Sequence, residues 1–171
     1  MKKCQIAIEG SLGRLKTTRR ELRCAAGFFA GRSSARSGLA FREVTVVLQD
    51  DAQSDRTHRA IMDVAGATDV ITQRYDAMPG EEPGVYGELY VNVERALSAA
   101  PARRGWSAEK ELLLYVAHGM DHLAGEDDLE ERGRRRMRRR ELAWVRGFCA
   151  GEPRCRSRLD FPAGSIPASR R

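Results

Sequence analysis

The chain has 171 residues, of which 42% are hydrophobic and 32% are charged. That composition is typical of a folded globular protein, and the length fits one domain with a sizeable core. No apolar run approaches the roughly 20 residues that span a bilayer, and the N-terminal apolar stretch is too short for a signal peptide. We therefore expect a cytoplasmic protein with no membrane-embedded segment.

The charge of the chain is unevenly distributed around a net value of +6. Residues 129–150 contain eight arginines and three glutamates, and residues 151–171 contain five arginines and two acids. Residues 50–94 contain ten acids and only three arginines. A basic C-terminal third suggests a polyanionic partner, most simply a nucleic acid, although a solvated arginine-rich helix would give the same pattern.

The four cysteines Cys4, Cys24, Cys149 and Cys155 show no CxxC spacing. Neither a zinc knuckle nor a redox dithiol is therefore indicated. In a reducing cytosol we expect free thiols.

In the N-terminal half, "QIAIEG" at residues 5–10 and "REVTVVLQDD" at residues 42–51 predict two strands by their alternation and β-branched residues. Residues 17–30 carry apolar side chains at helical spacing, and the small and polar residues 32–40 predict a loop. Ser54 is a plausible N-cap and predicts a short helix after it.

In the second half, residues 68–76 and 87–97 predict two more strands, joined by a loop rich in proline and glycine. Ser107 is expected to cap a helix that continues to residue 123. Because this helix is apolar nearly all round, it should be buried at the centre of the fold.

A final helix is predicted over residues 128–148. Its inward-facing residues are expected to be Leu129, Gly133, Met137, Trp144 and Phe148. Residues 151–171 contain prolines and few apolar residues, so they predict a flexible basic tail. Because strands and helices do not strictly alternate, the sequence predicts a single α+β domain over residues 1–150, in which a small mixed sheet packs with helices around one central helix.

The end of the central helix carries the stretch "HGMDHLAGEDD". His118 and His122 are four residues apart and therefore lie one turn apart on the same helix face. Gly125 can adopt positive φ and reverse the chain, which would bring Asp128 to that face. The metzincin-like pattern HxxxHxxGxxD thus offers two nitrogens, one carboxylate and an open position for water, as in catalytic zinc sites.

Other residues of the stretch leave alternatives open. Asp127 is the third ligand if the chain turns differently. Gly119 stands where zinc proteases of the HExxH type carry their general base, so peptide hydrolysis is disfavoured. Asp121 and Glu126 are either ordinary exposed acids or partners of the histidines. His58 is expected at the surface or in a cap.

"HGMDHLAGEDD" resembles the HGxxHLxGxDH signature of the YbeY family of bacterial ribosomal-RNA maturation factors. "TDVIT" at residues 68–72 and "GELYVN" at residues 87–92 resemble two strands of that family in the same order, so the resemblance covers residues 40–148. It implies a metal-dependent, single-strand-specific endoribonuclease that acts in the cytoplasm. The implied roles are 16S rRNA 3′-end processing and ribosome quality control, with ribosomal RNA and the small ribosomal subunit as partners.

The resemblance also implies the site residues. The family's first two metal ligands fall on His118 and His122, whereas its third histidine falls on Asp128. A carboxylate is an acceptable zinc ligand, so we expect one Zn²⁺ per chain, with harder ions such as Mn²⁺ more competitive than in the family. The expected catalytic group is a metal-bound water, and no side-chain base is assigned.

A second departure from the family is Met62, which stands where many members carry an arginine. Arg59 and Arg74 are nearby cations that could replace it. The arginines after the motif are expected to line an RNA groove. The candidates are Arg134, Arg135, Arg138 and Arg139, with Arg136 and Arg140 as further members of the run.

Two other functions remain open. The changes at Asp128 and Met62 would also suit a non-catalytic ribosome-assembly factor that keeps a structural metal. The third possibility is a metal-dependent hydrolase of another substrate.

Overall fold

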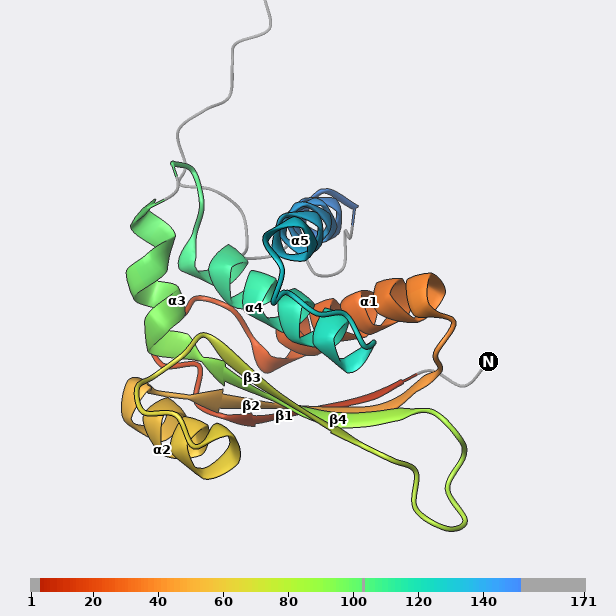
Figure 1. Ribbon diagram of the computed structural model, residues 1–171. Helices are drawn as coiled ribbons and strands as arrows, with labels where there is room; N and C mark the ends of the chain where they lie inside the picture. Colours follow the sequence, from red (N-terminus) through yellow and green to blue (C-terminus); the bar gives the residue numbers. More distant parts are fainter. Residues whose placement is uncertain (1–3, 103, 152–171) are drawn as a thin grey trace, which may run out of the picture.

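The computed structural model of the protein describes residues 4–102 and 104–151. They form a four-stranded mixed sheet with helices on both faces (Figure 1). The strands are β1 (Gln5–Gly10), β2 (Phe41–Gln49), β3 (Val70–Tyr75) and β4 (Val85–Asn92). They lie in the order β1-β2-β4-β3; β1 and β4 both pair with β2 in parallel, and β3 pairs with β4 antiparallel.

The helices form layers above and below this sheet. Helices α1 (Arg19–Ser37) and α4 (Ala108–Leu123) cover one face, and α5 (Glu131–Gly151) lies over both of them (Figure 1). Helix α2 (Asp51–Met62) lies under one end of the opposite face, and α3 (Val93–Ala99) packs against α4. A short 3-10 turn, Ala100–Ala102, follows α3. This arrangement confirms the predicted α+β fold with a central helix.

Helix α4 is the central element. Ser107 caps it by accepting a hydrogen bond from the Lys110 backbone N–H, as the sequence predicts. The residues from Leu112 to Ala117 are all buried. They are apolar all round because α4 contacts the sheet, α1, α3 and α5.

Two glycines set how closely α4 approaches the sheet. A Cβ atom added to Gly119 would lie 2.7 Å from Cδ2 of the buried Leu89 on β4. A Cβ added to Gly87 on β4 would lie 2.5 Å from Cδ2 of Leu123 and 2.7 Å from the Gln73 carbonyl oxygen. Each glycine therefore makes room for a leucine side chain of the facing element. Gly119 thus has a packing role, in addition to standing where a protease would carry its general base.

The predicted loop at residues 32–40 is wrong over its first six residues, because α1 continues to Ser37. The helix runs through Gly27 and Gly31 without a break, and Gly38 ends it with φ 75°. Ser33 is buried in this last part of α1, and its hydroxyl donates to the Asp121 carboxylate at 3.4 Å. Contact with α4 thus extends a helix that local composition does not favour.

Two helix starts also differ from expectation. Asp50 rather than Ser54 caps α2, because its side chain accepts a backbone N–H bond there. Ser54 is buried inside the helix, where its hydroxyl exchanges hydrogen bonds with the backbone of Thr68. The strand predicted over residues 87–97 ends at Asn92, whose side chain caps α3.

The last helix begins at Glu131, so Leu129 lies before it and is 81% exposed rather than inward-facing. The buried residues of α5 are Met137, Glu141, Val145 and Phe148, while Gly133 and Trp144 are partly buried. Of the cysteines, Cys4, Cys24 and Cys149 take part in no disulfide bond. Cys155 and the predicted tail, apart from Gly151, lie outside the described residues.

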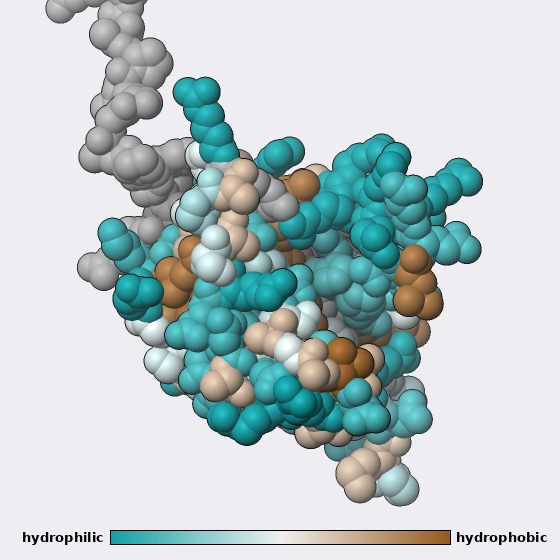
Figure 2. Space-filling model, turned by 60° about the vertical axis from the view of Figure 1, so that its left-hand side comes forward, coloured by the Kyte–Doolittle hydropathy of each residue, from teal (hydrophilic) through white to brown (hydrophobic). Residues whose placement is uncertain are grey.

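No helix in the described part of the chain is long and apolar enough to cross a membrane. On the face drawn in Figure 2, hydrophilic side chains dominate and hydrophobic ones gather only in small separate patches.

We expect Gly119→Ala to lower the free energy of unfolding by about 1 to 3 kcal/mol, because Leu89 must leave its packed position. Gly27→Ala is the matched control, since Gly27 lies inside α1 and a Cβ there meets nothing within 4 Å. The control should gain up to about 1 kcal/mol from helix propensity. Urea unfolding measures both changes, and equal gains in the two variants would contradict the packing role of Gly119.

Candidate metal centre

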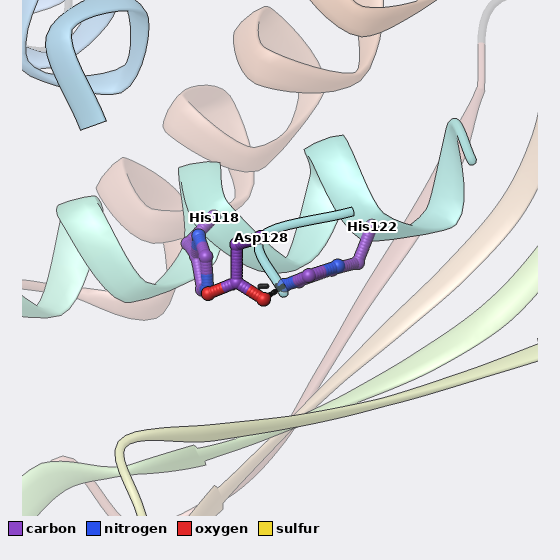
Figure 3. Close-up of side chains that lie close together, drawn as sticks. All are labelled: His118, His122 and Asp128. Atoms are coloured by element: carbon purple, nitrogen blue, oxygen red, sulfur yellow. Dashed lines mark hydrogen bonds and ion pairs between the residues drawn. The ribbon is translucent and has the colours of Figure 1, made fainter. Parts of the chain in front are cut away.

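Three side chains converge at the end of α4 (Figure 3). His118 and His122 come from its last turns, and Asp128 comes from the segment between α4 and α5 and lies between the two imidazoles. The two histidine Nε2 atoms are 3.0 Å apart. Each lies 3.8 Å from one carboxylate oxygen of Asp128.

These distances fit a divalent ion. Ligands about 2.0–2.1 Å from a tetrahedral zinc are separated from one another by roughly 3.3 Å. The two Nε2 atoms, 3.0 Å apart, are close to that separation, and each lies 3.8 Å from a different oxygen of Asp128, Oδ2 for His118 and Oδ1 for His122. One ligand atom from each residue lies within 4.8 Å of the others. Two imidazole nitrogens and a carboxylate are also a usual zinc donor set.

Both imidazoles are held in the orientation that ligation requires. The Nδ1–H of His118 donates to Oε1 of Glu141 at 2.7 Å, and that of His122 donates to the Glu126 backbone carbonyl at 2.9 Å. Because a carboxylate and a carbonyl only accept, each histidine carries a proton on Nδ1 and turns its Nε2 toward the other two side chains of the cluster.

The surroundings of His118 favour positive charge. Burial lowers the pKa of this imidazole, but the hydrogen bond and the negative charge of Glu141 outweigh burial, and Asp69 and Asp128 add to them. The net pKa of His118 is raised. Glu141, which is only 1% exposed, thus stabilises a cation at this position.

The segment after α4 turns as the sequence predicts. Gly125 has φ 87°, and the next backbone N–H, that of Glu126, donates to the Asp121 carbonyl at 3.1 Å. Of the two candidate third ligands, Asp128 faces the histidines. Asp127 instead accepts a hydrogen bond from the Leu129 backbone N–H at 2.8 Å.

An ion-pair network around the buried Asp121 holds this turn. Asp121 is fully buried, and one of its oxygens accepts bonds from Arg140 at 2.9 and 2.6 Å, while Arg36 approaches the other to 3.6 Å. Glu126 pairs with the same two arginines, at 3.0 and 2.7 Å. The network therefore connects α1, α4, α5 and the turn.

From the sequence, Asp121 and Glu126 are expected to be either exposed acids or partners of the histidines, and the structure gives them other roles. Asp121 is neither exposed nor bonded to a histidine, and it is the backbone of Glu126, not its carboxylate, that holds His122. Burial raises the pKa of Asp121, and Arg140 and Arg36 offset this only in part.

The cations proposed to replace the family arginine are engaged elsewhere. Arg74 donates to the Leu123 carbonyl at the end of α4 at 3.2 Å, and Arg59 pairs with an acid one turn earlier in α2. Met62 ends α2 and is 58% exposed. His58 bonds to the Gly66 carbonyl in the loop after α2, at 2.8 Å.

The arginines of α5 divide into separate groups. Arg140 belongs to the ion-pair network around Asp121. Arg134 donates to the Asp128 carbonyl at 3.3 Å, and Arg138 lies 3.8 Å from Glu111 on α4, so both lie on the side toward the site. The remaining arginines of the run are exposed.

Sequence reasoning missed Glu141, Arg36 and Ser33. A signal for Glu141 exists: it stands four residues after Met137 and four before Val145, so it is an acid on an apolar stripe. Such an acid needs a buried partner, and His118 supplies it. Ser33 and Arg36 carry no comparable signal, because their contacts come from another part of the chain.

A family model described as Endoribonuclease YbeY matches residues 14–148. The chain belongs to the YbeY family. An Endoribonuclease YbeY of Rhodopirellula baltica is 37% identical over 132 residues, which are 77% of this chain and 64% of the relative. One of Micrococcus luteus is 40% identical over 100 residues, which are 56% and 63% of the two chains. The chain thus spans less than two thirds of the length of either relative.

The solution structure of TM1509 from Thermotoga maritima is similar to this YbeY-family chain, with a TM-score of 0.55 and 25% sequence identity. The match covers 84% of this chain and 89% of the other.

We expect Arg140→Ala to lower the free energy of unfolding by about 3 kcal/mol or more, because it removes the closest partner of a fully buried carboxylate. Arg146→Ala is the control: Arg146 is an exposed arginine of the same helix, and its loss should change stability by less than about 0.5 kcal/mol. Chemical denaturation of both variants measures the difference, and similar small effects would show that the network does not hold the turn.

Proposed function

We propose that this chain is a metal-dependent endoribonuclease that cuts single-stranded RNA and acts in the cytoplasm in the maturation of ribosomal RNA, including processing of the 16S rRNA 3′ end, and in ribosome quality control. The observation that carries the proposal is the preoriented cluster of His118, His122 and Asp128 in a chain of the YbeY family. The relatives' name, Endoribonuclease YbeY, supports the reaction class.

The proposed ligands are His118, His122 and Asp128, and the proposed ion is Zn²⁺. Their side chains are 20%, 27% and 33% exposed, so water and single-stranded RNA can reach the open coordination position of the ion. When bound, a divalent ion supplies an activated water and a charge that offsets the developing charge on a phosphodiester. Asp128 in place of a third histidine makes the ligand set more negative. The added negative charge would strengthen binding of the ion and weaken the ion's Lewis acidity.

The chain's own residues supply orientation. Glu141 and the Glu126 carbonyl hold the two imidazoles in one orientation through their Nδ1 atoms, which lowers the cost of assembling the site. Arg134 and Arg138, on the site's side of α5, are the proposed contacts for the RNA backbone beside the cleaved bond. Small-subunit ribosomal RNA is the proposed substrate.

A non-catalytic assembly factor with a structural metal is the second candidate, favoured by Asp128 at the third ligand position and by the exposed Met62. Cleavage separates the two functions, because both bind metal but only the enzyme cuts RNA.

We expect the protein to cut a single-stranded fragment of the 16S rRNA 3′ region, to lose this activity on chelation, and to regain it with Zn²⁺ or Mn²⁺. His118→Ala and His122→Ala should abolish both metal binding and cleavage, and Asp128→Ala should weaken binding strongly. Asp128→His should keep the metal and raise activity if charge at the ion limits the reaction.

Asp127→Asn is the matched control, since the side chain of Asp127 turns toward the start of α5. It should keep wild-type metal content and activity. Metal content that is unchanged in Asp128→Ala would refute the third ligand, and full metal content without cleavage would favour the assembly factor.

A further inference from the structure

The exposed side of α5 carries a second basic feature, which we call the outer arginine face. A hollow of about 410 Å³ opens there. Its lining residues are Glu131, Arg132, Arg135, Arg136 and Arg139. With four arginines and one glutamate, the lining has a formal charge of +4 − 1 = +3.

The outer arginine face lies across α5 from the candidate metal centre. At 100° per residue, its arginines fall opposite the stripe of Met137, Glu141 and Val145, which is buried against the rest of the fold. Glu141 on that stripe bonds to His118, so an α-helix about 10 Å in diameter separates the hollow from the histidines.

The charge of this face is only partly compensated inside the chain. Arg135 pairs with Glu131, and Arg136 lies 3.6 Å from Glu126. Arg132 and Arg139 form no ion pair with any residue that the structure describes. Like charges three and four residues apart destabilise a helix, so an external polyanion would relieve a repulsion that the fold leaves in place.

The spacing of the arginines identifies the kind of anion. Residues 132 to 139 cover nearly two helical turns, or about 10 Å, which exceeds the reach of one phosphate. Guanidinium groups bind phosphate oxygens in a bidentate manner. The described lining residues include no aromatic side chain on which a base could stack. A run of backbone phosphates therefore fits the face better than a single ion or an unpaired base.

We propose that the outer arginine face anchors the phosphate backbone of RNA at a distance from the cleaved bond. The inference rests on the proposed function for the identity of the polyanion. It means that an RNA long enough to reach from the metal centre around α5 binds more tightly than one that fills the metal centre alone. The contacts are to the backbone, so the gain does not depend on base sequence.

The test compares two double variants of the full chain. Arg132→Gln/Arg139→Gln removes the two arginines of the face that form no ion pair with a described residue. Arg56→Gln/Arg146→Gln is the control, because it removes the same net charge from two exposed positions outside the hollow. Labelled single-stranded RNAs of 20 and 5 nucleotides are bound by each protein at several salt concentrations, in a His118→Ala background that prevents cleavage.

For the 20-nucleotide RNA we expect Kd to rise at least tenfold in the outer-face variant and the slope of log K against log salt to fall by about 1.4, or about 0.7 for each lost phosphate contact on a single strand. The 5-nucleotide RNA and the control should change by less than threefold. Equal effects of the two double variants on the 20-nucleotide RNA would overturn the anchor. The anchor would also be overturned if polyglutamate displaced the 20-nucleotide RNA as effectively as unlabelled RNA does. That result would point to an acidic protein as the partner instead.

Failure of the anchor and failure of the proposed function give different results. If the wild-type chain cuts no RNA but the outer-face variant loses binding, the anchor stands without the nuclease. If cleavage is sensitive to chelator but the outer-face variant binds like the control, the nuclease stands and the anchor is overturned.

Discussion

The close approach of α4 to the sheet is the constraint on which the site depends. Gly119 meets Leu89, and Gly87 meets Leu123, at distances that leave no room for a Cβ on either side. These contacts fix the helix along its last two turns, which are the turns that carry both histidines. A side chain at either glycine would lift the helix from β4 and move the ligands, so glycine beside His118 reflects packing as much as chemistry.

The second requirement is that the chain reverse sharply after α4 and stay there. Gly125 allows the reversal, and the buried Asp121 with its two arginines, Arg36 and Arg140, holds the turn against α1 and α5. Burying a charge such as that of Asp121 costs free energy, so we infer that the network serves to position the turn rather than to stabilise the fold. It brings Asp128 to the histidines and sets the Glu126 carbonyl to orient His122, so the three side chains converge as a candidate metal site.

The sequence predicts the elements and site residues that depend on short-range patterns. It does not predict the helix ends and buried partners that depend on contacts between distant parts of the chain. Periodicity and caps predict β1, β2, β3 and the buried α4, and the i, i+4 histidines followed by a glycine predict that His118, His122 and Asp128 lie together. Residues 32–37 look like a loop because nothing local shows that Ser33 and Arg36 contact Asp121. Glu141 sits among arginines and reads as a solvated acid, although its place on the apolar stripe of α5 indicates burial. Asp50 and Ser54 are both good caps, and packing against Thr68 decides between them.

The measurement that tests the central claim most directly is a zinc K-edge X-ray absorption spectrum of the protein, purified without a histidine tag and loaded with one equivalent of Zn²⁺. The account predicts a shell of nitrogen and oxygen at about 2.0–2.1 Å, with outer-shell scattering from two imidazoles. A sulfur shell at about 2.3 Å, or outer-shell scattering from fewer than two imidazoles, would contradict it.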